Sequence, residues 1–160
     1  EIQNKALEWM RRAREILPSL IEPARVASRQ RFRLQPAIRD TRRDHFLFQD
    51  GLLSGLVDFG AMDLETPAGD LARLMEDWLW ADPDGTLNAR AIASYSRVRA
   101  LNSYEIDVIP SHIRSTSVLA TAHWIRWHFV DRRTFEDPRA VERGIERGLS
   151  RLGHPRPIRI

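Results

Sequence analysis

The sequence contains no cysteine and only one lysine, Lys5, among its 160 residues. Without cysteine the chain forms neither disulfide bonds nor thiolate metal sites, which fits a reducing compartment such as the cytoplasm. Charged residues interrupt every apolar stretch, so none reaches the roughly 18 residues that would span a bilayer. We therefore expect a soluble, cytoplasmic protein with no membrane partner.

Glycine is also scarce, and this limits the ways in which the chain can bind phosphate groups. None of the 8 glycines lies in a G-x-G-x-x-G arrangement. The sequence therefore lacks the glycine-rich turn and the following lysine that hold phosphates in many nucleotide-binding enzymes, and it contains no P-loop or serine elbow. It begins at Glu1 with no signal-peptide pattern, so we expect a piece of a longer protein.

What the chain does have is arginine. The 25 basic residues exceed the 22 acidic ones by 3, and all the basic residues except Lys5 are arginine. Nucleic-acid binding is one reading of this charge, but the arginines are spread along the chain instead of forming a stripe among aromatic residues. Solvated helix faces and ion pairs within the chain are the favoured interpretation, and nucleic acid is an unlikely partner.

The hydrophobic pattern predicts a mainly α fold with a small β-hairpin, an α+β arrangement. With 42% hydrophobic residues, the chain has enough apolar surface for a single domain, residues 1–160, or one lobe of a larger one. A hairpin is expected over residues 46–57, around the turn dipeptide Asp50-Gly51. Apolar residues at steps of three and four predict helices over 2–17, 19–31, from about 70 to 81, 87–101, from 110 to about 131, and 138–152. Pro18 should separate the first two helices.

Acidic residues flank the predicted hairpin. Asp40, Asp44 and His45 precede the first strand, and Asp58 follows the second strand directly. Because strand pairing brings both ends of a hairpin together, Asp40 and Asp58 should lie close to one another. The plain alternatives are a charged loop that pairs with itself and an aspartate that only caps a turn.

This order of residues resembles the catalytic half of the aminoglycoside phosphotransferase and choline kinase family, in the protein-kinase-like superfamily. The resemblance is close over residues 33–82. It consists of a catalytic loop over 38–47, the hairpin, Asp58-Phe59-Gly60, and Pro67-Ala68-Gly69-Asp70-Leu71-Ala72 at the start of a helix. The resemblance implies the C-terminal lobe of a kinase-like fold that uses ATP and Mg²⁺.

The same resemblance implies roles for the residues around the hairpin. Asp40 would be the catalytic base that accepts the proton of the substrate hydroxyl, and Asp58 would hold Mg²⁺. His45 stands where the family has an asparagine as its second metal ligand. Since Mg²⁺ prefers oxygen, Asp44 could replace His45 as a ligand.

Further residues would serve the nucleotide or the loop. Leu47 and Val57 would lie under the adenine, and Arg39 and Arg43 are assigned to the nucleotide with them. Asp70 would cap its helix and brace the catalytic loop. Ile38 and Arg39 replace the His-Gly usual in the family, although arginine before the catalytic aspartate is common in protein kinases.

Three functions remain open at this stage. The first is the C-terminal lobe of an ATP-dependent phosphotransferase that acts on a hydroxyl of a small molecule, inactive as this fragment because the N-terminal nucleotide-gripping lobe lies outside the chain. The second is a degenerate kinase-like binding module, and the third is a basic nucleic-acid-binding module. Glu105 and Asp107 could face a cationic acceptor or lie on a solvated surface.

Overall fold

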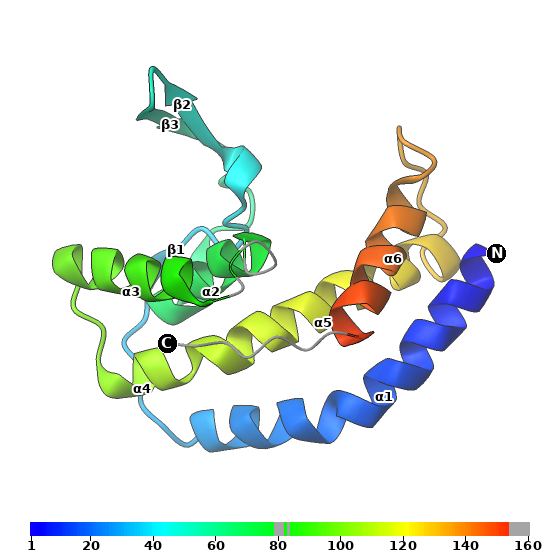
Figure 1. The fold of residues 1–160 in the computed structure, drawn as a ribbon, viewed down its shortest axis with the longest axis horizontal. Coiled ribbons are helices and arrows are strands. Elements are labelled where there is room, and N and C mark those ends of the chain that lie inside the picture. The colour runs from blue at the N-terminus through cyan, green and yellow to red at the C-terminus, as the bar shows by residue number, and fades with distance from the viewer. Residues whose placement is uncertain (79–81, 83, 154–160) are drawn as a thin grey trace.

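The computed structural model describes residues 1–78, 82 and 84–153, and over these residues the protein is mainly helical with two small antiparallel sheets. The predicted mainly α fold with a small β component is confirmed. Figure 1 shows the β2–β3 hairpin projecting away from the helices, while α5 runs between the α2 side of the molecule and the pair α1 and α6. No described helix is both long and apolar enough to cross a membrane.

A single helix, α1 (Ile2–Ala27), replaces the two helices expected on either side of Pro18. That prediction was wrong, because both proline residues, Pro18 and Pro23, lie inside the helix. The helix bends along its length, as expected where prolines remove backbone hydrogen bonds (Figure 1). Buried residues occur on both sides of Pro18, from Trp9 to Leu20, so packing against the rest of the protein offsets the cost of the prolines.

The predicted hairpin is present as β2 (Phe46–Gln49) and β3 (Leu52–Leu56), which pair antiparallel. Asp50 and Gly51 connect them with φ angles of 50° and 77°, the left-handed conformation that a tight hairpin turn requires. A register shift between Leu47 and Phe48 adds an irregularity to the pairing. The hairpin therefore follows from local turn chemistry.

A second strand pair was not expected. β1 (Gln35–Ala37) pairs antiparallel with β4 (Asp63–Glu65), so that Ala37 lies opposite Asp63. This pair encloses the loop after β1, the short 3₁₀ helix η1 (Arg43–His45), and the whole hairpin. The β1–β4 pair therefore brings together the two ends of the segment over residues 38–62, which contains Asp40, His45 and Asp58.

The remaining helices largely follow the predicted pattern, with changes at their ends. They are α2 (Pro67–Trp78), α3 (Thr86–Val98), α4 (Ser103–Asp107), α5 (Ile109–Phe129) and α6 (Ala140–Gly153). Residues 79–81 of the predicted third helix lie outside the described residues, α3 ends earlier than expected, and α4 was not expected. Pro110 lies in the first turn of α5, where its missing N–H costs no helical hydrogen bond. Asp137 precedes α6, where its Oδ1 accepts a hydrogen bond of 2.9 Å from the N–H of Arg139.

Helix α5 contributes to both clusters of buried apolar side chains. Its first half, with Ile109 and Ile113, packs with Met75 of α2 and Ile92 of α3. Its second half packs with α1 and α6 in a cluster whose buried members are Ala6, Trp9, Ala13, Val141 and Ile145. The helix thereby links the side of the molecule that carries the loop to the side that carries α6.

At the edge of the second cluster, Lys5 of α1 forms ion pairs with α6. Its Nζ lies 2.7 Å from Oε1 of Glu142 and 2.6 Å from Oε1 of Glu146, both on α6. These hydrogen bonds raise the pKa of Lys5. The one lysine of the sequence therefore ties α1 to α6.

Candidate active site

The hairpin brings its two acidic ends together as predicted. Phe46 pairs with Leu56, and beyond this pair the N–H of Val57 donates to the carbonyl of His45 at 3.0 Å. His45 and Asp58 are therefore held side by side at the base of the hairpin. Asp58 has a φ of 64°, an unusual conformation for a residue other than glycine and one often found at functional sites.

Asp40, His45 and Asp58 form a group that could hold a metal ion. One ligand atom from each residue lies within 4.8 Å of the others. The Nδ1 atom of His45 contacts the backbone oxygen of Asp40 at 2.8 Å, and since that oxygen only accepts, Nδ1 is the donor. In the neutral ring the lone pair is then on Nε2, which lies 3.8 Å from Oδ2 of Asp58.

These donors fit a divalent cation. Metal-bound histidines usually donate their second ring N–H to a carbonyl or carboxylate, as His45 does here. The two carboxylates suit Mg²⁺ or Mn²⁺, whereas the imidazole nitrogen suits softer ions such as Fe²⁺ or Zn²⁺ better. Asp44 is outside this group of three residues. Its side chain is 64% exposed and pairs with Arg42, and its Oδ1 lies 4.0 Å from Nε2 of His45. Its assignment as an alternative ligand stays a prediction.

Asp70 braces the loop over residues 38–47, which the resemblance identified as the catalytic loop. Its two carboxylate oxygens accept hydrogen bonds of 2.7 Å each from the N–H groups of Ile38 and Arg39, and its backbone oxygen accepts one of 2.7 Å from the Thr41 hydroxyl. Asp70 lies in the first turn of α2, so the helix and the loop are joined directly ahead of Asp40. The loop is thereby fixed on both sides of the proposed base.

Arg39 adopts a φ of 64°, in the left-handed region that glycine enters without strain. This conformation gives a physical reason for the glycine that the family usually has at this place. The Arg39 guanidinium pairs with Asp63 at 3.1 Å and with Glu65 at 3.5 Å, both on β4. Its assignment to the nucleotide stays a prediction, and the side chain has carboxylate partners of its own.

The other residues assigned to the nucleotide lie along the hairpin or just before it. Leu47 and Val57 are 46% and 41% exposed, which leaves apolar surface open at the hairpin. The backbone N–H of Arg43 donates to Oδ2 of Asp77 at 2.9 Å, which attaches η1 to α2. No contact in the described residues tests the roles of these three side chains.

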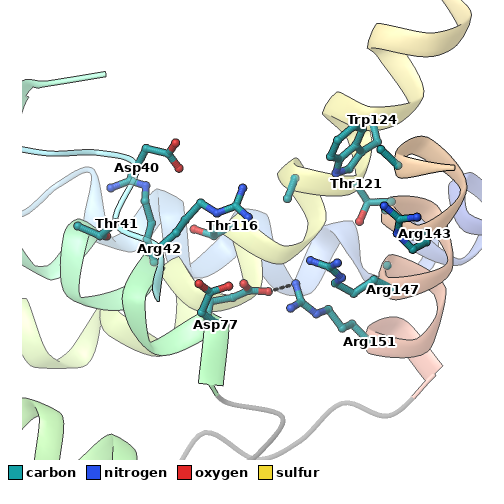
Figure 2. Close-up of a pocket in the computed structure, with 16 residues that line it drawn as sticks. Asp40, Thr41, Arg42, Asp77, Thr116, Thr121, Trp124, Arg143, Arg147 and Arg151 are labelled. Carbon is teal, nitrogen blue, oxygen red and sulfur yellow. Dashed lines mark hydrogen bonds and ion pairs between the residues drawn. The ribbon is translucent and has the colours of Figure 1, made fainter. Parts of the chain in front are cut away.

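Next to Asp40 lies a pocket of about 250 Å³. Figure 2 shows Asp40 and Arg42 on one side, Asp77 of α2 below them, and arginines of α6 on the opposite side. Thr116, Thr121 and Trp124 of α5 contribute its inner surface. The pocket joins the catalytic loop to the helices that follow the family motifs.

Two glycines allow α6 to lie directly against α5. A Cβ atom at Gly144 would be 2.5 Å from the Trp124 ring, and one at Gly148 would be 2.5 Å from Cγ2 of Thr121. Both distances are too short for a carbon atom, so only glycine permits this approach. The arginines on the same helix, Arg143, Arg147 and Arg151, recur every fourth residue and therefore share one face. The recurrence of arginine at every fourth residue, with glycines between, is the sequence pattern that indicates this arginine-lined face of the pocket.

An ion pair joins Glu76 of α2 to Arg151 of α6, and both residues line the pocket. Burial raises the pKa of Glu76 in spite of the opposing effect of Arg151, and burial likewise lowers the pKa of Arg151. Both groups are removed from water, so the pair links α2 to α6 at a real desolvation cost.

Glu105 proved to be neither a substrate contact nor a solvated residue. Its side chain is 1% exposed and accepts two hydrogen bonds from Arg99, at 3.0 and 3.1 Å. It also forms a capping box with Asn102 at the start of α4. Both alternatives weighed for Glu105 were wrong, because the partner Arg99 and the local cap together satisfy a buried carboxylate.

Comparison with known proteins agrees with this arrangement. Residues 3–104 match the phosphotransferase enzyme family. A homoserine kinase of Methylobacterium radiotolerans is 35% identical over 83 residues, which cover 49% of this chain and 26% of that kinase. The aligned part thus spans about a quarter of the relative, and no solved structure matches significantly. Since the family match includes more than half of the chain and all of the motifs at the hairpin, this protein belongs to the phosphotransferase enzyme family.

Proposed function

We propose that this chain is the catalytic, C-terminal part of an ATP-dependent kinase that transfers the γ-phosphate to a hydroxyl group of a small molecule. The observation that carries the proposal is the group of Asp40, His45 and Asp58 at the base of the hairpin, beside an open pocket. The family match supports phosphoryl transfer in general. The acceptor and the roles of individual residues are part of the proposal.

In this proposal Asp40 accepts the proton of the acceptor hydroxyl as its oxygen attacks the γ-phosphate. Asp40 suits this role because it lines the pocket and belongs to the candidate metal group at the same time. Asp58 and His45 would hold a divalent ion, which when bound neutralises charge on the nucleotide phosphates. The exposed side chains of Leu47 and Val57 would meet the adenine.

The acceptor would enter the pocket between the catalytic loop and α6. Its volume of about 250 Å³ lies below the roughly 300–1,000 Å³ of pockets for drug-sized ligands, which favours a small acceptor. The similarity to a homoserine kinase makes L-homoserine the first acceptor to test. We also propose that a lobe outside this chain grips the nucleotide, so the isolated chain is inactive.

The test of the proposed base is Asp40→Asn in the natural protein that contains this chain. We expect turnover with ATP, Mg²⁺ or Mn²⁺, and a panel of small alcohols including L-homoserine to fall about 100- to 10,000-fold. Asp107→Asn is the matched control, because Asp107 is exposed and does not line the pocket, which favours a solvated surface over an acceptor contact. Equal turnover in the Asp40 variant would contradict the assignment.

A second candidate function is a degenerate kinase-like module that binds a partner and does not catalyse. His45 favours it, since a histidine stands where the family uses an oxygen ligand. Thermal-shift titration of the natural protein with ATP and a divalent ion separates the two functions. A catalytic protein should be stabilised by both together and should lose this response in Asp58→Asn, whereas a module without nucleotide binding should show no shift in either form.

A further inference from the structure

The pocket beside Asp40 is rich in arginine. Five arginines and three acidic residues line it; the arginines are Arg42, Arg73, Arg143, Arg147 and Arg151. A pocket for a purely cationic acceptor would be expected to show the opposite balance. The excess of guanidinium groups therefore indicates that the ligand brings negative charge with it.

Four of these arginines already have a carboxylate partner within the protein. Arg42 pairs with Asp44, Arg73 with Glu65, Arg143 with Asp137, and Arg151 with Glu76. These pairs fix the walls of the pocket and partly neutralise its charge. Arg147 is the arginine of this set that has no such carboxylate pair among the described residues.

Arg147 makes no hydrogen bond or ion pair with any residue in the described part of the chain. It lies at the centre of the row on α6, one turn from Arg143 and one turn from Arg151. Figure 2 shows its side chain extending into the space between α6 and the loop that carries Asp40. Arg143 and Arg151 lie one turn away on either side, and Glu76, which also interacts electrostatically with Arg147, is already paired with Arg151. An anion placed there would therefore meet mainly guanidinium groups.

Helix packing positions the backbone that carries the exposed side chain of Arg147. Gly148 follows Arg147 directly and sets the close approach of α6 to α5, while Gly144 does the same one turn earlier. The backbone that carries Arg147 is therefore positioned by contacts that tolerate no added atom. A side chain on such a rigid element is well suited to bind a ligand at a defined distance from Asp40.

We propose that Arg147 binds a carboxylate of the acceptor, so that the substrates of this pocket are small alcohols that carry a carboxylate group. The inference rests on the proposed function, because it takes Asp40 as the group that meets the acceptor hydroxyl. The carboxylate at Arg147 and the hydroxyl at Asp40 then orient the acceptor across the pocket. A guanidinium can bind a carboxylate in two parallel hydrogen bonds, which fixes orientation as well as affinity.

Three related compounds test the carboxylate requirement on this chain by calorimetric titration. L-homoserine has a hydroxyl, an ammonium and a carboxylate; 4-hydroxybutyrate lacks the ammonium, and 3-aminopropan-1-ol lacks the carboxylate. We expect the first two to bind on the order of 10- to 100-fold more tightly than the third, as the loss of a charge-assisted contact implies. Equal binding of all three compounds, or no binding of any, would overturn the proposal.

Variants then assign the effect to one side chain. Arg147→Ala should weaken binding of the two carboxylates to the level of 3-aminopropan-1-ol, and Arg147→Lys should retain part of the affinity because it keeps the charge but not the planar fork. Arg90→Ala on α3 is the matched control, since Arg90 is exposed and outside the pocket. An unchanged affinity in Arg147→Ala, with an unchanged melting temperature, would refute the role of this residue.

Kinetics on the natural protein distinguish the acceptor from the nucleotide as the source of the anion. Arg147→Ala should raise KM for L-homoserine about 10- to 100-fold and leave KM for ATP unchanged. A rise in KM for ATP alone would overturn the proposal in favour of a phosphate contact. Carboxylate-dependent binding without phosphoryl transfer would refute only the proposed function, whereas transfer without dependence on Arg147 would refute only this inference.

Discussion

Asp70 offers a direct test of whether the catalytic loop depends on α2. Asp70→Ala removes the acceptor of two hydrogen bonds of 2.7 Å, from the N–H groups of Ile38 and Arg39. Hydrogen bonds to a charged group contribute about 1.5–3 kcal/mol each, and their effects are not additive. We therefore expect a loss of about 3 kcal/mol in the free energy of unfolding.

The same substitution should affect catalysis through the position of Asp40. Arg39 has a φ of 64°, a conformation that costs about 1–3 kcal/mol and persists only where the surroundings impose it. Without Asp70 the loop can relax, and a displacement of about 1 Å of a catalytic group can lower turnover about 100-fold. We expect this fall in kcat in addition to the loss of stability.

The assay pairs thermal unfolding of this chain with turnover of the natural protein. A loss of about 3 kcal/mol corresponds to a melting temperature roughly 6–12 °C lower for a chain of this size. The exposed Asp107→Asn is the control, with no change expected in either measurement. Unchanged stability would refute the brace, and a lower melting temperature with normal kcat would show that the loop holds Asp40 without help from α2.

Two further predictions concern helix packing and pH. Gly148→Ala should lower the free energy of unfolding by about 1–3 kcal/mol, because its Cβ would lie 2.8 Å from Cβ of Thr121, whereas Gly55→Ala should change it little, since the nearest atom is 3.5 Å away. Equal melting temperatures of the two variants would contradict the packing argument. Glu105→Gln should cost about 1–3 kcal/mol at pH 7. Burial disfavours the charged form of Glu105, but the hydrogen bonds, led by those from Arg99, outweigh this effect and lower its pKa. The charged carboxylate therefore stabilises the fold at pH values above the ordinary pKa of a glutamate. The difference between wild type and Glu105→Gln should therefore shrink as the pH falls through the folded pKa, and a constant difference down to pH 3 would refute this reasoning.

Local chemistry determined the hairpin and what stands at its ends. Asp50 and Gly51 favour a tight turn by their own conformational preferences, so the pairing of β2 with β3 needs no distant partner. Once that pairing forms, His45 and Asp58 must meet. The sequence therefore determined the candidate metal group, apart from the contact that orients His45 through the Asp40 carbonyl.

Only the tertiary structure decided features that depend on partners far along the chain. Helix α1 continues through Pro18 because packing on both sides outweighs the local cost of proline. β1 finds β4 across the whole hairpin segment, and Glu105 is buried because Arg99 and a cap satisfy its charge. Local propensity carries no information about such long-range contacts.

The pocket shows the same division most clearly. The recurrence of arginine every fourth residue on α6 is visible in the sequence, and by itself it indicates only a charged helix face. Packing through Gly144 and Gly148 turns that face toward Asp40, about a hundred residues away, and Arg147 is left without a hydrogen bond or ion pair among the described residues. Sequence determined which charges the chain has, and the fold decided which of them remain available to a ligand, because availability depends on every other group that packs nearby.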